Sequence, residues 1–220
     1  MPVGRLSSPP PRGAILAVGS SSIRLWETLK QDFSPLPVVR RGFGGAMMSD
    51  VLAYADRIVL PYEPLVVLLY AGENDLAGRR TPRQVLADFR ELIQTIHARL
   101  PDARIALISI KPSISRTHLF DRIRRANALL KAEAARYEFV DFIDVFTPML
   151  DEQRNLKREL FANDGLHLNT NGYHLWASVI KPRLACHGQA DAERSPNLTR
   201  RPFRPPHGKL PSPLRHAHSH

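Results

Sequence analysis

Cysteine and long apolar runs are both scarce in this 220-residue sequence. Cys186 is the single cysteine, which excludes a disulfide within the chain and a cysteine-based metal cluster. No apolar run reaches the roughly 18 to 20 residues of a membrane-spanning helix, and residues 1–12 lack the continuous apolar segment of a secretory signal. We therefore expect a soluble, cytoplasmic protein, held by packing alone, with no metal and no cofactor.

Positive charge dominates: the sequence has 31 Lys and Arg residues and 21 Asp and Glu residues, which gives a net charge of +10. A nucleic acid or an anionic membrane is one class of partner for such a chain. However, residues 187–220 carry six of the basic residues against two acidic ones, in a segment rich in Pro and His. That composition is more typical of a solvated, disordered end. We therefore expect that the protein does not bind nucleic acid. The alternative is that the basic tail binds nucleic acid.

The prolines gather at the two ends of the chain, whereas the middle has the apolar content of a folded domain. The sequence predicts a flexible segment at 1–12, one domain at 13–186 and a disordered tail at 187–220.

Within that domain, apolar runs of strand length alternate with segments of helical period. Strands are expected at 14–18, 37–39, 65–70, 105–110 and 139–143, and helices at 22–30, 47–59, 82–100, 119–136 and 171–184. The run at 65–70 is apolar without alternation, which indicates a strand buried on both faces. Strands separated by helices are joined by right-handed crossovers. The pattern predicts an α/β fold, a three-layer αβα sandwich around a five-stranded parallel sheet.

Four polar or glycine-rich segments follow expected strands or lie in a late loop. They are Gly-Ser-Ser-Ser at 19–22, Gly-Phe-Gly-Gly at 42–45, Ala-Gly-Glu-Asn-Asp at 71–75 and Asp-Gly-Leu-His at 164–167. Ligands of open parallel sheets bind beyond the carboxyl ends of the strands. We expect these four segments to meet at one edge of the sheet.

Together these segments hold the groups that acyl transfer requires. A serine hydroxyl needs a histidine to take its proton and a carboxylate to orient that histidine, and Ser21, His167 and Asp164 supply this set. An oxyanion needs fixed donors, which the backbone N–H groups of Ser21 and Gly45 and the side-chain amide of Asn74 can provide.

Each segment alone has an ordinary interpretation. The serines at 19–22 fit a flexible turn or a helix cap, and the glycines at 42–45 fit a tight turn or a phosphate-binding turn. Residues 71–75 fit an Asx turn, and residues 164–167 fit a hydrogen-bonded loop pair or half of a metal site. No second histidine or cysteine stands at ligand spacing from His167. The glycines at 42–45 lack the Gly-x-Gly-x-x-Gly pattern and a P-loop lysine, which disfavours a nucleotide-binding protein. It is the combination that favours a hydrolase.

In this order, residues 19–26, 41–45, 72–75 and 164–169 resemble the four sequence blocks of the SGNH/GDSL hydrolase family. The resemblance spans about 13–184 and implies a flavodoxin-like fold and ester hydrolysis. It implies Ser21 as nucleophile, Asp164 and His167 as its partners, and Ser21, Gly45 and Asn74 as the oxyanion hole. Lys111-Pro112-Ser113 also resembles a segment of the branch whose first block reads Gly-Ser-Ser-Ser.

Two features depart from the usual family pattern. Ser20 replaces the aspartate of the first block, as in the Gly-Ser-Ser-Ser branch. Among the three serines we choose Ser21 as the nucleophile, because Trp26 then lies at the family distance from Gly19. Arg40 and Arg41 stand where an asparagine commonly opens the second block, so a hydrogen bond that steadies the oxyanion loop is missing or replaced.

The expected function is that of a serine esterase of the carboxylesterase or acetylesterase type, with a small-molecule ester as its partner. Because no long lid segment is evident, the acyl group is expected to be short, such as acetyl. The alternative is a catalytically inactive SGNH-fold module that binds a ligand, which the altered second block supports.

Overall fold

The structure, a computed structural model, describes residues 14–194. The flexible segment expected at 1–12 and the part of the tail at 195–220 lie outside the described residues. The described strands are β1 (Ile15–Gly19), β2 (Val38–Gly42), β3 (Val66–Tyr70), β4 (Arg104–Ile108) and β5 (Val140–Ile143). They form one parallel sheet in the order β2-β1-β3-β4-β5. The predicted five-stranded parallel sheet is confirmed.

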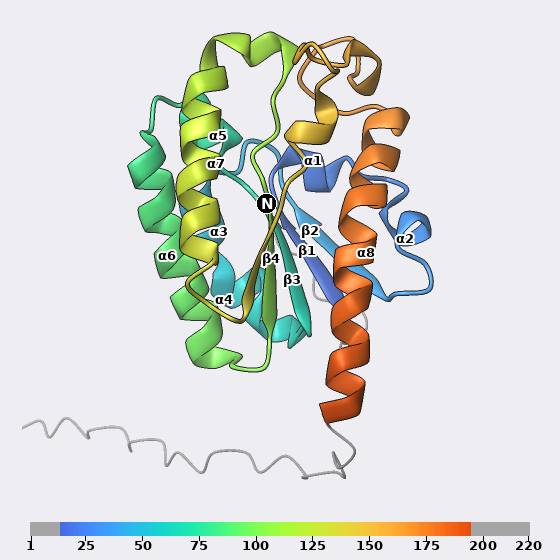
Figure 1. The fold of residues 1–220 in the computed structure, drawn as a ribbon. Helices are drawn as coiled ribbons and strands as arrows, with labels where there is room; N and C mark the ends of the chain where they lie inside the picture. The colour runs from blue at the N-terminus through green and yellow to red at the C-terminus, as the bar shows by residue number, and fades with distance from the viewer. Residues whose placement is uncertain (1–13, 195–220) are drawn as a thin grey trace, which may run out of the picture.

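Helices cover both faces of this sheet, and Figure 1 shows α6 and α7 on one side and α8 on the other. The described helices are α1 (Ser21–Arg24), α2 (Leu29–Asp32), α3 (Met48–Ala53), α4 (Ala55–Ile58), α5 (Glu73–Ala77), α6 (Pro82–Arg99), α7 (Phe120–Ala134) and α8 (Thr170–Arg194). Short 3-10 turns occur at η1 (Leu60–Tyr62), η2 (Ile114–Leu119), η3 (Thr147–Met149) and η4 (Arg158–Leu160). The three-layer arrangement agrees with the prediction.

Two apolar clusters, one on each face of the sheet, make up the core. Successive residues of β1 alternate between them: Leu16 and Val18 belong to the cluster under α6 and α7, and Ile15 and Ala17 to the cluster under α8. Trp176 is fully buried in the second cluster, where it packs edge-on against Trp26. Burial on both faces explains why the strands read as continuous apolar runs.

Two predicted helices are each divided in the structure, and one short helix was not predicted. The helix expected at 22–30 is divided into α1 and α2; in the break between them, Trp26 Nε1 and Thr28 Oγ1 both donate to the carboxylate of Asp32, the last residue of α2. The helix expected at 47–59 is likewise divided at Tyr54, between α3 and α4. The short helix α5 was not expected.

The last helix is also longer than predicted. We expected it to end near residue 184, but α8 continues to Arg194 through Pro182. Residues 185–194 include three alanines, together with Gln and Glu, which are good helix formers. The boundary set between residues 186 and 187 therefore lies inside a helix.

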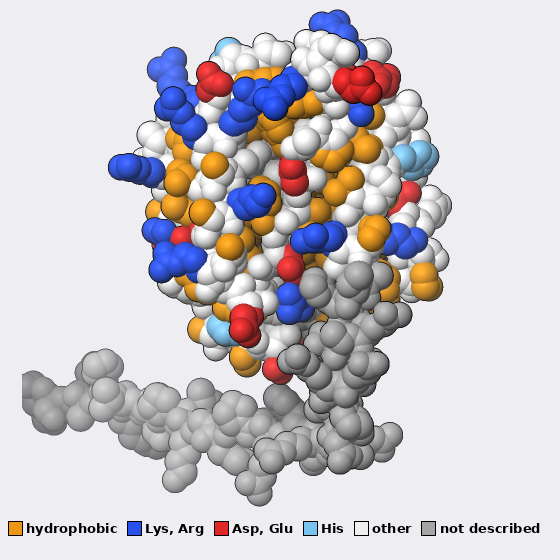
Figure 2. All heavy atoms as spheres, in the orientation of Figure 1, with side chains coloured by type: hydrophobic (Ala, Val, Ile, Leu, Met, Phe, Trp, Pro, Cys, Tyr) orange, Lys and Arg blue, Asp and Glu red, His pale blue; other side chains and the backbone are white. Residues whose placement is uncertain are grey.

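Charged side chains do not gather in one place on the face drawn in Figure 2. On the face drawn in Figure 2, Lys and Arg side chains lie at several separate places, with Asp and Glu side chains among them. None of the helices in the described range 14–194 combines the length and the apolar content that a membrane span requires.

Candidate active site

The turn after β1 places Ser21 at the carboxyl edge of the sheet. Gly19 pairs with Tyr70 of the neighbouring β3, and a Cβ on Gly19 would lie 1.8 Å from the Tyr70 carbonyl oxygen. Gly19 also has a φ of +138°, so only glycine fits here. The chain then turns sharply into α1, whose first residue is Ser21. Ser20 and Ser22 are buried, whereas Ser21 is half-buried at the surface of the turn.

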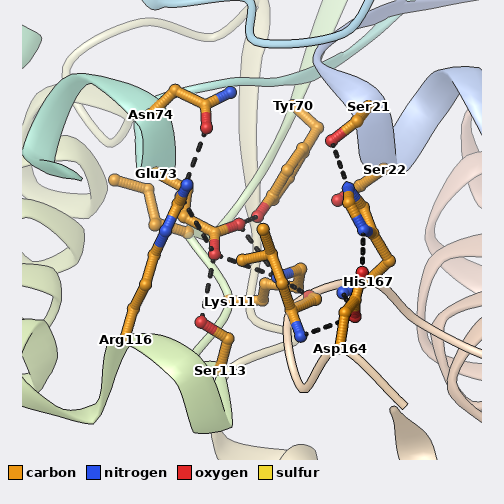
Figure 3. Close-up of polar contacts among 12 residues, drawn as sticks. Ser21, Ser22, Tyr70, Glu73, Asn74, Lys111, Ser113, Arg116, Asp164 and His167 are labelled. Carbon is orange, nitrogen blue, oxygen red and sulfur yellow. Dashed lines mark hydrogen bonds and ion pairs between the residues drawn. The ribbon is translucent and has the colours of Figure 1, made fainter. Parts of the chain in front are cut away.

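His167 and Asp164 reach Ser21 from the loop that precedes α8. His167 Nδ1 lies 2.5 Å from Asp164 Oδ2, and His167 Nε2 lies 3.1 Å from Ser21 Oγ. Figure 3 shows the three side chains in line, in the order Ser21, His167, Asp164. Ser21 and His167, 146 positions apart in the sequence, thus lie within hydrogen-bond distance, as the combination of the four segments led us to expect.

Asp164 is anchored by its own loop. Asp164 Oδ1 accepts hydrogen bonds from the backbone N–H groups of Leu166 (2.9 Å) and His167 (3.0 Å). Burial alone would raise the pKa of Asp164, but the hydrogen bond from the His167 ring and those from the two N–H groups outweigh it and hold the pKa at about 2. The carboxylate is therefore ionised at neutral pH and can stabilise a positive charge on His167.

The segments that carry Gly45 and Asn74 lie next to each other. Asn74 Nδ2 donates to the carbonyl oxygen of Ala46 at 3.1 Å, and the backbone N–H of Met48 donates to the buried Asp75 carboxylate at 2.9 Å. Gly45 has a φ of +75°, and no other group lies within 4 Å of where its Cβ would be. Gly45 is exposed, and Asn74 contacts the residue that follows it, so the two lie close together, while their role as donors to one oxyanion stays a prediction.

Arg40 and Arg41, the departures in the second block, hold other parts of the molecule. Arg40 donates to the carbonyl oxygen of Trp26, two residues beyond the end of α1, at 2.7 Å. Arg41 donates to the Tyr62 hydroxyl, and its guanidinium carbon lies 4.8 Å from the centre of that ring. The glycine loop itself is fixed by the Phe43 N–H, which donates to the Gly19 carbonyl oxygen at 2.9 Å. This backbone hydrogen bond anchors the glycine loop without the asparagine that commonly opens the second block.

A buried polar cluster underlies the site, and its contacts were not predicted from the sequence. Glu73 accepts hydrogen bonds from the Tyr70 hydroxyl (2.8 Å) and the Ser113 hydroxyl (3.2 Å), and its carboxylate lies 2.9 Å from Lys111 Nζ. Lys111, which is 1% exposed, also donates to the Leu166 carbonyl oxygen at 2.7 Å. Because Leu166 precedes His167, the cluster ties the third block to the histidine loop (Figure 3).

Burial sets the protonation behaviour of this cluster. Burial, reinforced by the nearby Glu73 carboxylate, raises the pKa of Tyr70 well above its usual range, so the phenol keeps its proton and acts as a donor. Burial lowers the pKa of Lys111, and the attraction to Glu73 opposes that shift. Within residues 14–194, no group of three or more His, Cys, Asp or Glu side chains is arranged to hold a metal ion.

Comparison with known proteins identifies the family. The model of the GDSL-like Lipase/Acylhydrolase family matches residues 15–175. The chain belongs to this family. Membership agrees with the resemblance seen in the four sequence blocks and makes the chain an acylhydrolase, a hydrolase of ester bonds.

The chain is also similar to curated proteins and to solved structures. The chain is 26% identical over 164 residues to the platelet-activating factor acetylhydrolase IB subunit alpha1 of Bos taurus, covering 72% of this chain and 69% of that one. A putative platelet activating factor structure from Streptococcus pneumonia superposes with a TM-score of 0.72 at 24% identity, covering 79% and 84% of the two chains. A GDSL-like lipase from Bacteroides thetaiotaomicron gives 0.68 at 20% identity, covering 79% and 88%. These likenesses confirm the fold.

Proposed function

We propose that this protein is a serine esterase that hydrolyses short acyl esters through an acyl-enzyme on Ser21. The observation that carries the proposal is the position of His167, whose two ring nitrogens lie within hydrogen-bond reach of Ser21 Oγ and the Asp164 carboxylate. Membership in an acylhydrolase family supports the reaction class.

The reaction begins when Ser21 Oγ attacks the carbonyl carbon of the ester and passes its proton to His167 Nε2. Asp164 stabilises the imidazolium that forms. The tetrahedral intermediate then collapses, and His167 gives the proton to the departing alcohol oxygen. Water attacks the acyl-enzyme, His167 takes the proton of that water, and the carboxylic acid leaves as Ser21 recovers its proton.

The negative charge of each tetrahedral intermediate develops on the former carbonyl oxygen. The backbone N–H groups of Ser21 and Gly45 and the Asn74 side-chain amide are proposed to donate to that oxygen. Asn74 Nδ2 uses one hydrogen for the Ala46 carbonyl oxygen, and its second hydrogen remains for the substrate. Donors fixed in advance cost no reorganisation as the charge forms, which is why each contributes strongly to the rate.

Acid pH should affect the proposed pair through one proton only. The pKa of Asp164 is about 2, so this carboxylate stays ionised and takes up no proton while the pH falls from 7 to about 4. A plot of log(kcat/KM) against pH should therefore have an acid limb with a slope of one. The profile is measured with p-nitrophenyl acetate, and circular dichroism checks folding at each pH. A slope of two would mean that Asp164 is protonated as well.

A short acyl group is the substrate feature that the chain favours. Residues 144–169 form the longest connection, yet Met149, Leu160 and Phe161 of this segment are buried in the core under α8 instead of forming a separate lid. The similar Bos taurus protein is named an acetylhydrolase, which supports the same choice. We expect kcat/KM for p-nitrophenyl acetate to exceed that for p-nitrophenyl decanoate by about tenfold or more. Faster turnover of the decanoate would refute the short-acyl assignment and leave the serine mechanism intact.

A further inference from the structure

Arg116 touches the side chain that is proposed to donate to the oxyanion. Its Nη1 lies 3.2 Å from Asn74 Oδ1 and 3.5 Å from Glu73 Oε1. Figure 3 shows Arg116 extending from η2 to Asn74, on the side away from Ser21. The side chain is only 20% exposed, so its charge acts in a largely buried setting.

The contacts of Asn74 allow one orientation of its amide. Oδ1 accepts from Arg116, and Nδ2 donates to the Ala46 carbonyl oxygen. Rotating the amide by 180° would place Nδ2 against the Arg116 guanidinium, two donors together, and Oδ1 against the Ala46 carbonyl oxygen, two acceptors together. Arg116 and Ala46 therefore direct the NH2 edge toward the glycine loop, where the substrate oxygen would lie.

Glu73 holds Arg116 in this position. Its buried carboxylate accepts hydrogen bonds from the hydroxyl groups of Tyr70 and Ser113 and forms ion pairs with Lys111 and Arg116. Two cations share this single carboxylate, so the cluster carries an excess of positive charge beside Asn74. Positive charge on the carbonyl side of an amide polarises it and makes its N–H groups stronger donors.

We propose that Arg116 is a positioning residue of the oxyanion hole, which fixes and polarises the Asn74 amide so that Nδ2 faces the reacting oxygen. This inference rests on the proposed function, because it gives Asn74 the role of oxyanion donor. It assigns a role to a residue that none of the four sequence blocks contains.

Replacing Arg116 with methionine should lower kcat for p-nitrophenyl acetate about tenfold or more with little change in KM, since the donor acts mainly in the transition state. Arg125→Met is the matched control: it removes the same charge from an exposed arginine on α7 and should leave kcat unchanged. Arg116→Gln, a polar replacement, should show the same loss if Arg116→Met folds poorly. A wild-type kcat in both Arg116 variants would overturn the proposal.

A double-mutant cycle separates positioning from a general structural role. Asn74→Ala should lower kcat about a hundredfold or more, and adding Arg116→Met should then cause little further loss, because the amide that Arg116 orients is gone. If the two losses multiply, Arg116 does not act through Asn74 and the proposal fails. Failure of the proposed function differs: Ser21→Ala would then be as active as the wild type.

A measurement that needs no turnover completes the test. The side-chain amide resonances of Asn74, assigned by their absence in Asn74→Ala, should shift in the proton–nitrogen NMR spectrum of Arg116→Met and stay in place in Arg125→Met. Unchanged Asn74 resonances in Arg116→Met would overturn the proposal even if kcat fell.

Discussion

Replacing Ser21 with alanine is expected to lower kcat for p-nitrophenyl acetate by about a thousandfold or more, since no nucleophile then remains to form the acyl-enzyme. Ser21 is half-buried and its hydroxyl contacts only His167 among the described side-chain hydrogen bonds, so the variant should fold as the wild type does. Steady-state kinetics give the loss, and thermal unfolding shows that both proteins are folded.

Ser20→Ala is the matched control for this substitution. Ser20 is the preceding residue in the same turn and is 3% exposed, and the hydrogen bond that it makes to Tyr70 uses its backbone N–H, which alanine keeps. We expect Ser20→Ala to retain most of the activity. Activity that is lost in Ser20→Ala and kept in Ser21→Ala would contradict the choice of nucleophile.

His167→Ala is expected to cause a loss comparable to that of Ser21→Ala, because Ser21 is a weak nucleophile unless His167 takes its proton. Members of such a triad act as a unit, so their effects do not add. The double variant Ser21→Ala/His167→Ala should therefore be about as slow as either single variant, with the remaining rate due to the oxyanion donors and substrate binding. Long-duration assays with purified protein measure the rates of the two single variants and of the double variant against the uncatalysed reaction.

His174→Ala serves as the control for the histidine. His174 lies one turn into α8 and is exposed, outside the hydrogen-bonded chain of the site. This variant should keep the wild-type rate. A double variant much slower than both single variants would show that Ser21 and His167 contribute independently, which the proposed mechanism does not allow.

The sheet could be predicted from the sequence because burial on both faces leaves a local mark. Runs such as 65–70 are apolar without alternation, and each is followed by a helical period. The order β2-β1-β3-β4-β5 left no such local mark, since it depends on which strands pair across the sheet; only the family resemblance implied it, through the flavodoxin-like fold. Short helices were also missed: α5 has five residues, too few to show a helical period.

Within the site, the sequence pointed to the groups that are proposed to perform the chemistry but not to the groups that hold them. Ser21, Asp164 and His167 stand in polar segments after strands or in a loop, and the combination of these segments, together with the family resemblance, suggested their roles. Arg116 contacts Glu73 and Asn74, and the latter lies 42 positions away in the sequence, so no local pattern encodes these contacts. One signal was present: Lys111 is a charged residue directly after the apolar run at 105–110, in a position that the fold buries.

The most direct test of the serine mechanism is a fluorophosphonate probe followed by peptide mass spectrometry on the wild type and Ser21→Ala. The mechanism predicts one adduct on the wild type, located at Ser21, together with loss of p-nitrophenyl acetate hydrolysis, and no adduct on the variant. A folded wild-type protein that takes up no probe and hydrolyses no ester would contradict the account and favour a ligand-binding module with the same fold.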